Sequence, residues 1–167
     1  MSDPVMRSRT NYFHVKDIDA LRADLARYGI TAVGWQHRPE SQRHFVLDDG
    51  VDNKPEGAIA LFCFDDWPSF EEDAIANQPE LDDDDGESDR PQIPDDHADL
   101  FDLVASHLVD ADVAVFMTTG YEKMRILLGS AVAVNARGEQ VVLDLHDIYN
   151  HAATLATDGT PITKAWY

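Results

Sequence analysis

With 167 residues, the chain is long enough to bury a core within one domain, and its apolar fraction of 44% is that of a folded protein. Its 13 basic and 32 acidic residues give a net charge of −19, which repels nucleic acid and anionic lipid and attracts basic protein surfaces. The composition therefore argues against direct binding to nucleic acid or membrane. We predict a single domain over residues 1–167.

The expected compartment follows from three sequence features. The apolar runs are much shorter than the roughly 20 residues that a membrane-spanning helix needs. No apolar signal-peptide segment precedes Arg9, and the one cysteine, Cys63, excludes an internal disulfide, as in a reducing cytoplasm. We expect a soluble protein in the cytoplasm of a host cell.

The first part of the chain predicts four strands and one helix. Alternating apolar residues indicate strands over residues 11–16, 30–35 and 43–47, and a run that is apolar on both faces indicates a central strand over 58–64. Between the first two strands, Asp17 is placed to cap a helix whose apolar stripe is Ile18, Leu21, Leu25 and Tyr28. Gly29 is expected to end that helix.

The periodic pattern fails between about residues 65 and 94. A short helix that starts near Asp65 and ends by Asn77 is compatible with the sequence, but Pro79, Gly86, Pro91 and Pro94 prevent a longer one. A regular apolar stripe returns over residues 95–108 and predicts a second full helix.

The last third of the chain predicts three strands and a final helix. The strands are expected over residues 112–118, 124–134 and 139–145, with a hairpin connection at 135–138 in which Gly138 suits a left-handed conformation. The middle strand carries small residues on one face (Gly129, Ala131 and Ala133), which should allow a helix to approach closely. A last helix is expected over residues 147–156.

Consecutive strands on short connections favour antiparallel pairing. We therefore predict an α+β fold, with a mainly antiparallel sheet, about three helices packed on one face, and an acidic loop–helix insertion over about residues 65–102.

The negative charge is concentrated in one part of the chain. Residues 65–102 hold 16 acids and one base, a net charge of −15, whereas residues 1–64 carry −1 and residues 103–167 carry −3. Halophilic adaptation would spread acidity over the whole surface, so it does not explain this distribution. Two interpretations stay open: a solvated segment that keeps the protein soluble, and a surface that binds a basic partner.

On the predicted helix, Asp95, Asp99 and Asp102 have the spacing of a row along one face. Neighbours about 5–6 Å apart on a helix come close to the spacing of phosphates along a DNA strand. A row of carboxylates with this spacing can occupy the Lys and Arg side chains that otherwise bind the phosphates of a DNA duplex. The candidate partner-binding residues are Glu71, Glu72, Asp73, Asp82, Asp83, Asp84, Asp85, Glu87, Asp89, Asp95, Asp99 and Asp102. Core packing is the favoured role for Trp67 and Phe70, and an apolar anchor beside the charge is the alternative.

The sequence shows no recognisable catalytic or metal-binding pattern. If Gly86 is aligned with the glycine of an EF-hand loop, Leu81 and Gln92 stand where two essential carboxylates belong. The histidines have no metal-ligand spacing, since His146 and His151 fall on different helix faces. Cys63, within the most apolar strand, is expected to be a buried and inert thiol. We therefore expect no metal, no cofactor and no enzymatic activity.

Two segments resemble small proteins encoded by phages, plasmids and integrative elements. Residues 10–17 match their opening T-N-Y-F-x-V-x-D, and residues 120–134 resemble their G-x-E-K-x-R…L-x-G-x-A-x-V segment. Both motifs concern strands, and together they cover about a quarter of the sequence. The resemblance implies a setting in which anti-CRISPR and anti-restriction proteins occur, several of which are acidic DNA mimics.

From charge and resemblance together we predict an inhibitor from a mobile element. Its expected partner is the basic DNA-binding surface of a host defence complex, with a CRISPR surveillance complex as first choice and a restriction enzyme as second. The alternative is an accessory or regulatory protein whose acidic loop docks on a basic partner surface, and an enzyme comes third.

Overall fold

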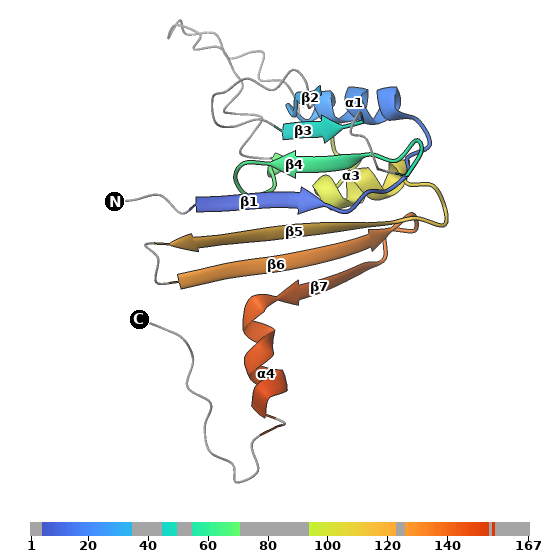
Figure 1. Cartoon of the computed structure of the whole chain (residues 1–167). Helices are drawn as coiled ribbons and strands as arrows, with labels where there is room; N and C mark the ends of the chain where they lie inside the picture. Colours follow the sequence, from blue (N-terminus) through green and yellow to red (C-terminus); the bar gives the residue numbers. More distant parts are fainter. Residues whose placement is uncertain are drawn as a thin grey trace, which may run out of the picture.

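The computed structural model describes residues 5–34, 45–49, 55–70, 94–122, 126–153 and 155. These residues form a seven-stranded sheet with helices, in an α+β arrangement (Figure 1). The predicted fold class is thus confirmed at the level of an α+β fold built on a mixed sheet. None of the described helices is long and apolar enough to cross a membrane.

The sheet has the strand order β2-β3-β4-β1-β5-β6-β7, so β1 lies in the middle and β2 and β7 form the edges. Among the described strands every pairing is antiparallel except the parallel β2–β3 pair. The strands are β1 (Val5–Thr10), β2 (Ala32–Gly34), β3 (Phe45–Asp48), β4 (Ala60–Cys63), β5 (Val113–Glu122), β6 (Ile126–Asn135) and β7 (Gln140–Asp144).

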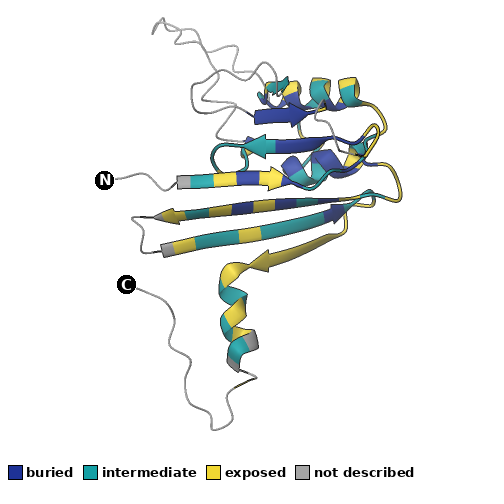
Figure 2. Cartoon of the chain, viewed as in Figure 1, coloured by how far each residue is buried: buried dark blue, intermediate teal, exposed yellow. Residues whose placement is uncertain are grey.

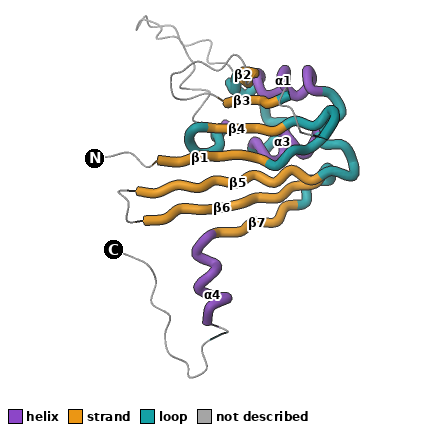
Figure 3. Tube along the Cα trace, viewed as in Figure 1, coloured by secondary structure: helices purple, strands orange, loops and turns teal. Residues whose placement is uncertain are grey.

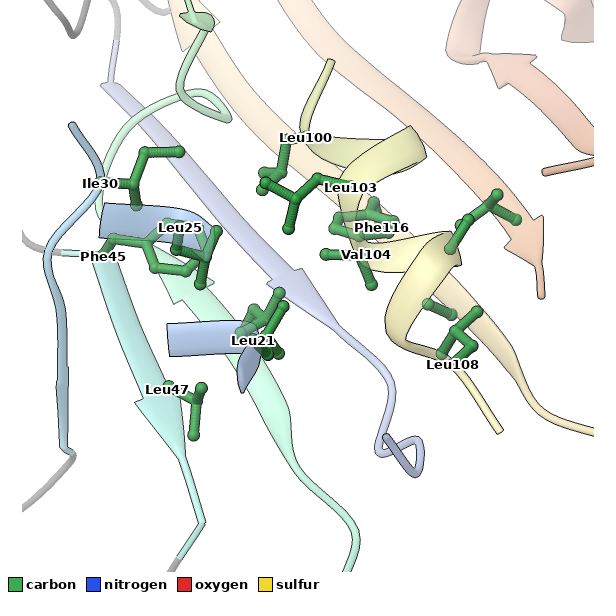
Figure 4. Close-up of a cluster of buried hydrophobic side chains, with 14 of the residues drawn as sticks. Leu21, Leu25, Ile30, Phe45, Leu47, Leu100, Leu103, Val104, Leu108 and Phe116 are labelled. Atoms are coloured by element: carbon green, nitrogen blue, oxygen red, sulfur yellow. The ribbon is translucent and has the colours of Figure 1, made fainter. Parts of the chain in front are cut away.

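Two helices, α1 (Ile18–Arg27) and α3 (Leu100–His107), share one buried cluster with the sheet (Figure 4). From α1 the cluster contains Leu21 and Leu25, and from α3 it contains Leu100, Leu103 and Val104. The strand residues in it are Phe45, Leu47, Leu61, Ala114, Phe116 and Val134, which the pairing register places on one face of the sheet. We call the opposite face the back face.

A short 3-10 helix, η2 (Leu145–Asp147), leads from β7 into α4 (Ile148–Ala153). Figure 1 shows α4 beyond the β7 edge, apart from α1 and α3, and none of its described residues belongs to the buried cluster. Figure 3 shows the same division, with strands side by side and α4 at one end.

The helix that follows Asp17 is confirmed in detail. The Asp17 side chain accepts hydrogen bonds from the backbone N–H groups of Asp19 and Ala20, as an N-cap residue does. At the other end Gly29 has a φ of 79°, the left-handed conformation that ends many helices. The β6–β7 hairpin is confirmed as well, with a φ of 76° at Gly138.

The first strand was predicted too late in the chain. It covers Val5–Thr10, whereas residues 11–16 make only isolated bridges, Phe13 to Ile59 and Val15 to Leu108. Strand pairing ends because the Asn11 side chain takes over the backbone groups of β5. It donates to the Val113 carbonyl and accepts from the Val115 N–H.

The predicted close approach of a helix to the small residues of β6 is made by the short 3-10 helix η2 and not by α3. Val132 and Val134 face the cluster that contains α3, so this helix packs on the face with large residues. Gly129 lies on the back face, where a Cβ atom would come within 3.3 Å of the Leu145 Cβ of η2. The close approach that small residues allow therefore serves a side chain from the neighbouring segment.

Candidate functional site

Tyr28 contacts the described residues on both sides of the acidic stretch 71–93. Tyr28 is the C-cap of α1 and is fully buried. Its ring stacks on Phe70 with 4.0 Å between ring centroids, and its hydroxyl oxygen accepts a hydrogen bond of 3.0 Å from the His97 backbone N–H. We call Tyr28, Phe70 and His97 the Tyr28 corner.

Residues 71–93, between the two sides of this corner, lie outside the described residues. They hold ten of the sixteen acids of the segment and its one base, Arg90. Nine of the predicted partner-binding residues belong to this stretch, namely Glu71, Glu72, Asp73, Asp82, Asp83, Asp84, Asp85, Glu87 and Asp89. The structure fixes only where the stretch begins and ends.

The three other predicted site residues are described, and they do not form a row on one helix. The helix begins at Leu100, so Asp95 lies in the preceding loop, where it is exposed. Asp99 is the N-cap: its side chain accepts the Asp102 N–H at 2.8 Å. The prediction of a helix from residue 95 was therefore wrong at its start, because the Asp99 side chain caps the backbone one turn later than expected.

Asp102 has a structural partner as well. One of its carboxylate oxygens lies 3.3 Å from the Ala98 N–H and 3.4 Å from His97 Nδ1. Negative charge in the first turn is favourable because it faces the positive end of the helix dipole. Asp99 and Asp102 thus stabilise α3, although the Asp102 side chain still exposes 44% of its surface.

Basic groups compensate part of the charge next to the corner. Arg27 lies 2.6 Å from Asp96 and 3.1 Å from Asp24, and His107 Nε2 lies 2.8 Å from Asp24. Burial acts to raise the pKa of Asp24, but the hydrogen bonds from Arg27 and His107 outweigh it and leave that pKa below its usual value. These contacts join α1, α3 and the loop before α3.

Trp67 and Phe70 belong to the core, as favoured for both. Phe70 is buried in the hydrophobic cluster, and Trp67 packs edge-on against Phe45 and Phe116. Asp66 also has a local role, since its side chain accepts the Trp67 N–H at 2.8 Å. Neither aromatic residue is an exposed anchor.

Two further expectations concern reactive side chains. Cys63 is half-buried rather than fully buried, because the apolar run ends at the rim of the core. Among the residues that the structure describes, no three His, Cys, Asp or Glu side chains are grouped as a metal site would require.

Sequence reasoning missed Tyr28 as the organising residue of the site. It was predicted on the apolar stripe of α1, which is correct, but nothing in the sequence shows that its hydroxyl group meets residue 97. The distance along the chain, 69 residues, hides the contact.

Comparison with protein-family models, curated proteins and solved structures finds no significant match for this chain.

Proposed function

We propose that this protein is a mobile-element inhibitor that uses its acidic segment to occupy a DNA-binding surface of a host defence complex. The observation that carries the proposal is the distribution of charge, −15 over residues 65–102 against −1 and −3 on the two sides. A field of this sign and density attracts the Lys and Arg side chains that bind phosphates. The mechanism is steric and electrostatic competition, without turnover.

The geometry supports a single acidic surface next to the Tyr28 corner. Both described sides of the acidic stretch are held at the Tyr28 corner, so its ten acids start and end next to α1 and α3. Asp95 and Asp96 are exposed beside it. The corner thus serves as the base of an acidic surface.

The individual acids do not all have the same role. Asp99 and Asp102 bind backbone groups of α3, and Arg27 neutralises part of the charge of Asp96. We therefore assign partner binding chiefly to Asp95 and to the acids of residues 71–93. Of these side chains Asp95 is described, and it is exposed.

The nature of the target rests on the resemblance of residues 10–17 and 120–134 to proteins of mobile elements. In that setting a CRISPR surveillance complex is the first candidate and a restriction enzyme the second. The competing hypothesis is an accessory protein whose acidic segment docks on a basic surface without displacing DNA.

Competition with DNA tests the proposal. Purified surveillance complexes and restriction enzymes are mixed with labelled target duplex and increasing amounts of this protein, and bound DNA is measured by electrophoretic mobility shift. The proposal predicts that DNA is released in proportion to the protein bound. A ternary complex that keeps its full affinity for DNA would support the accessory protein instead.

A charge-neutralised variant identifies the segment responsible. Replacing Asp82, Asp83, Asp84 and Asp85 by Asn should weaken binding by at least tenfold at 0.1 M salt, mostly through slower association, because the summed field speeds encounter. The matched control removes four acids elsewhere: Asp52, Glu56, Asp110 and Asp158 become Asn or Gln. Equal losses in both variants, or a wild-type affinity that is unchanged up to 1 M salt, would contradict the proposal.

A further inference from the structure

The edge strand β7 has the side-chain pattern of an interior strand. One edge of β7 pairs with β6, and no described strand pairs with its other edge. The pairing register places Val141 and Leu143 on one face of β7 and Val142 on the other, and these side chains are 72%, 56% and 67% exposed. Figure 2 shows β7 in the colour of exposed residues. Strands that are apolar on both faces are normally covered on both, and natural edge strands usually carry charged residues or proline against pairing.

The neighbouring surface is apolar as well. The pairing register places Val141 and Leu143 on the back face, together with Met117 and Tyr121 of β5 and Leu127 of β6. All of these side chains are at least 42% exposed. Beyond the edge, Leu145 and Ile148 are 45% and 57% exposed. A contiguous apolar area of this kind on a soluble protein marks an interaction surface.

The sequence of β7 is complementary to itself in antiparallel orientation. If two copies pair about Val142, then Val142 lies opposite Val142 of the second copy and Val141 lies opposite Leu143. Gln140 then lies opposite Asp144, so that no acid faces another acid. A two-fold interface needs such a self-complementary patch.

The placement of charge favours the same partner. Each chain carries −19, yet β7 contains one acid, and the exposed basic residues Arg7 and Arg9 lie on the back face of β1. The Tyr28 corner is on α1, which Figure 1 shows beside β2 and β3, toward the opposite edge of the sheet. Association through β7 therefore leaves the Tyr28 corner, with the exposed Asp95 and Asp96 beside it, away from the interface.

We propose that β7 pairs with β7 of a second copy and joins two sheets into one continuous sheet. Five paired residues give about 17 Å of strand edge, which is too little for the roughly 800 Å² per partner of a stable interface. Leu145 of η2 and Ile148 of α4 must therefore add to the contact. Figure 1 shows α4 projecting past the β7 edge, on the side where the proposed dimer adds the strands of the partner.

Mass measurement of the full chain tests the assembly. Size-exclusion chromatography with light scattering, over a concentration series at 0.15 M salt, should give twice the 18.7 kDa of one chain. The variant Val142→Lys places two ammonium groups at the two-fold axis and should weaken the dimer at least a hundredfold. Since Val142 is exposed in the single chain, circular dichroism should remain that of the wild type.

Two further variants make the test specific for β7. Val113→Lys changes an exposed valine on β5, away from the edge, and should leave the dimer unchanged. Mixing Val142→Lys with Val142→Glu should restore a dimer, because opposite charges then meet at the axis. A wild type that stays monomeric at all concentrations overturns the proposal. So does a dimer that Val142→Lys leaves intact, or a Lys/Glu mixture that does not reassociate.

Discussion

At the scale of single residues, histidine–aspartate pairs connect segments that are distant in sequence. His14 Nδ1 lies 2.7 Å from Asp112, which joins the loop before α1 to the loop before β5. The hydrogen bond that the His14 ring donates to the Asp112 carboxylate, followed by the contact of the ring with the Glu56 carbonyl, raises the pKa of His14. The backbone N–H of His14, followed by its ring, lowers the pKa of Asp112 despite partial burial.

The pH dependence of stability follows from these two directions. A raised pKa at His14 gives stability that is complete below its unfolded value of 6.5 and lost as the pH rises through the folded pKa. A lowered pKa at Asp112 gives stability that is complete above 3.8 and lost as the pH falls through the folded pKa. The pair therefore stabilises the fold most between about pH 4 and 6.5.

We predict that His14→Asn removes the loss of stability that the wild type shows as the pH rises through the folded pKa of His14. The Asn amide can still donate to Asp112 but carries no titrating charge, so the difference in melting temperature between wild type and variant should shrink as the pH rises from 6 to 8.5. Melting followed by circular dichroism measures it. A difference that is constant over this range would show that His14 ionisation does not contribute to stability.

At the scale of elements, capping decides where α3 begins. The apolar stripe is compatible with a helix from residue 95, but Asp99 has an extended backbone and its side chain binds the Asp102 N–H. Asp95 and Asp99 therefore have different roles in the structure, although they are the same residue type within one acidic segment.

Alanine substitutions should separate these two roles. Asp99→Ala is expected to lower the free energy of unfolding by about 1 kcal/mol, the usual cost of losing an N-cap. Asp95→Ala, at an exposed loop position, should change it by less than about 0.5 kcal/mol. Urea denaturation of both variants measures the difference, and equal effects would contradict the assignment of Asp99 as the cap.

At the scale of the whole molecule, Tyr28 connects the helical layer to both sides of the acidic segment. The ring is fully buried against Phe70, and the hydroxyl group holds residue 97. The acidic segment is therefore anchored in the same hydrophobic core that joins the sheet to α1 and α3.

Two substitutions at Tyr28 should show this connection. Tyr28→Phe removes one hydrogen bond and is expected to cost about 1 kcal/mol of unfolding free energy. Tyr28→Ala leaves a cavity in the core and is expected to cost about 3–5 kcal/mol, as for other buried aromatic residues. Chemical denaturation measures both, and a cost below about 1 kcal/mol for the alanine variant would place the corner outside the cooperative core.

The sequence alone determined the features that depend on neighbouring residues. The Asp17 cap, the left-handed Gly29 and Gly138, and most of the strands follow from local backbone preferences and from the spacing of apolar side chains. The concentration of charge in residues 65–102 is likewise a property of the sequence.

Tertiary structure decided what depends on contacts between distant residues. The side chain of Asn11 ends β1 by bonding to β5, and Tyr28 brings residues 70 and 97 together. The strand order, which leaves the apolar β7 at an edge, also follows from pairings between distant segments. Local periodicity shows which face of an element is apolar, but only the assembled sheet decides whether that face is covered, because coverage depends on which elements become neighbours.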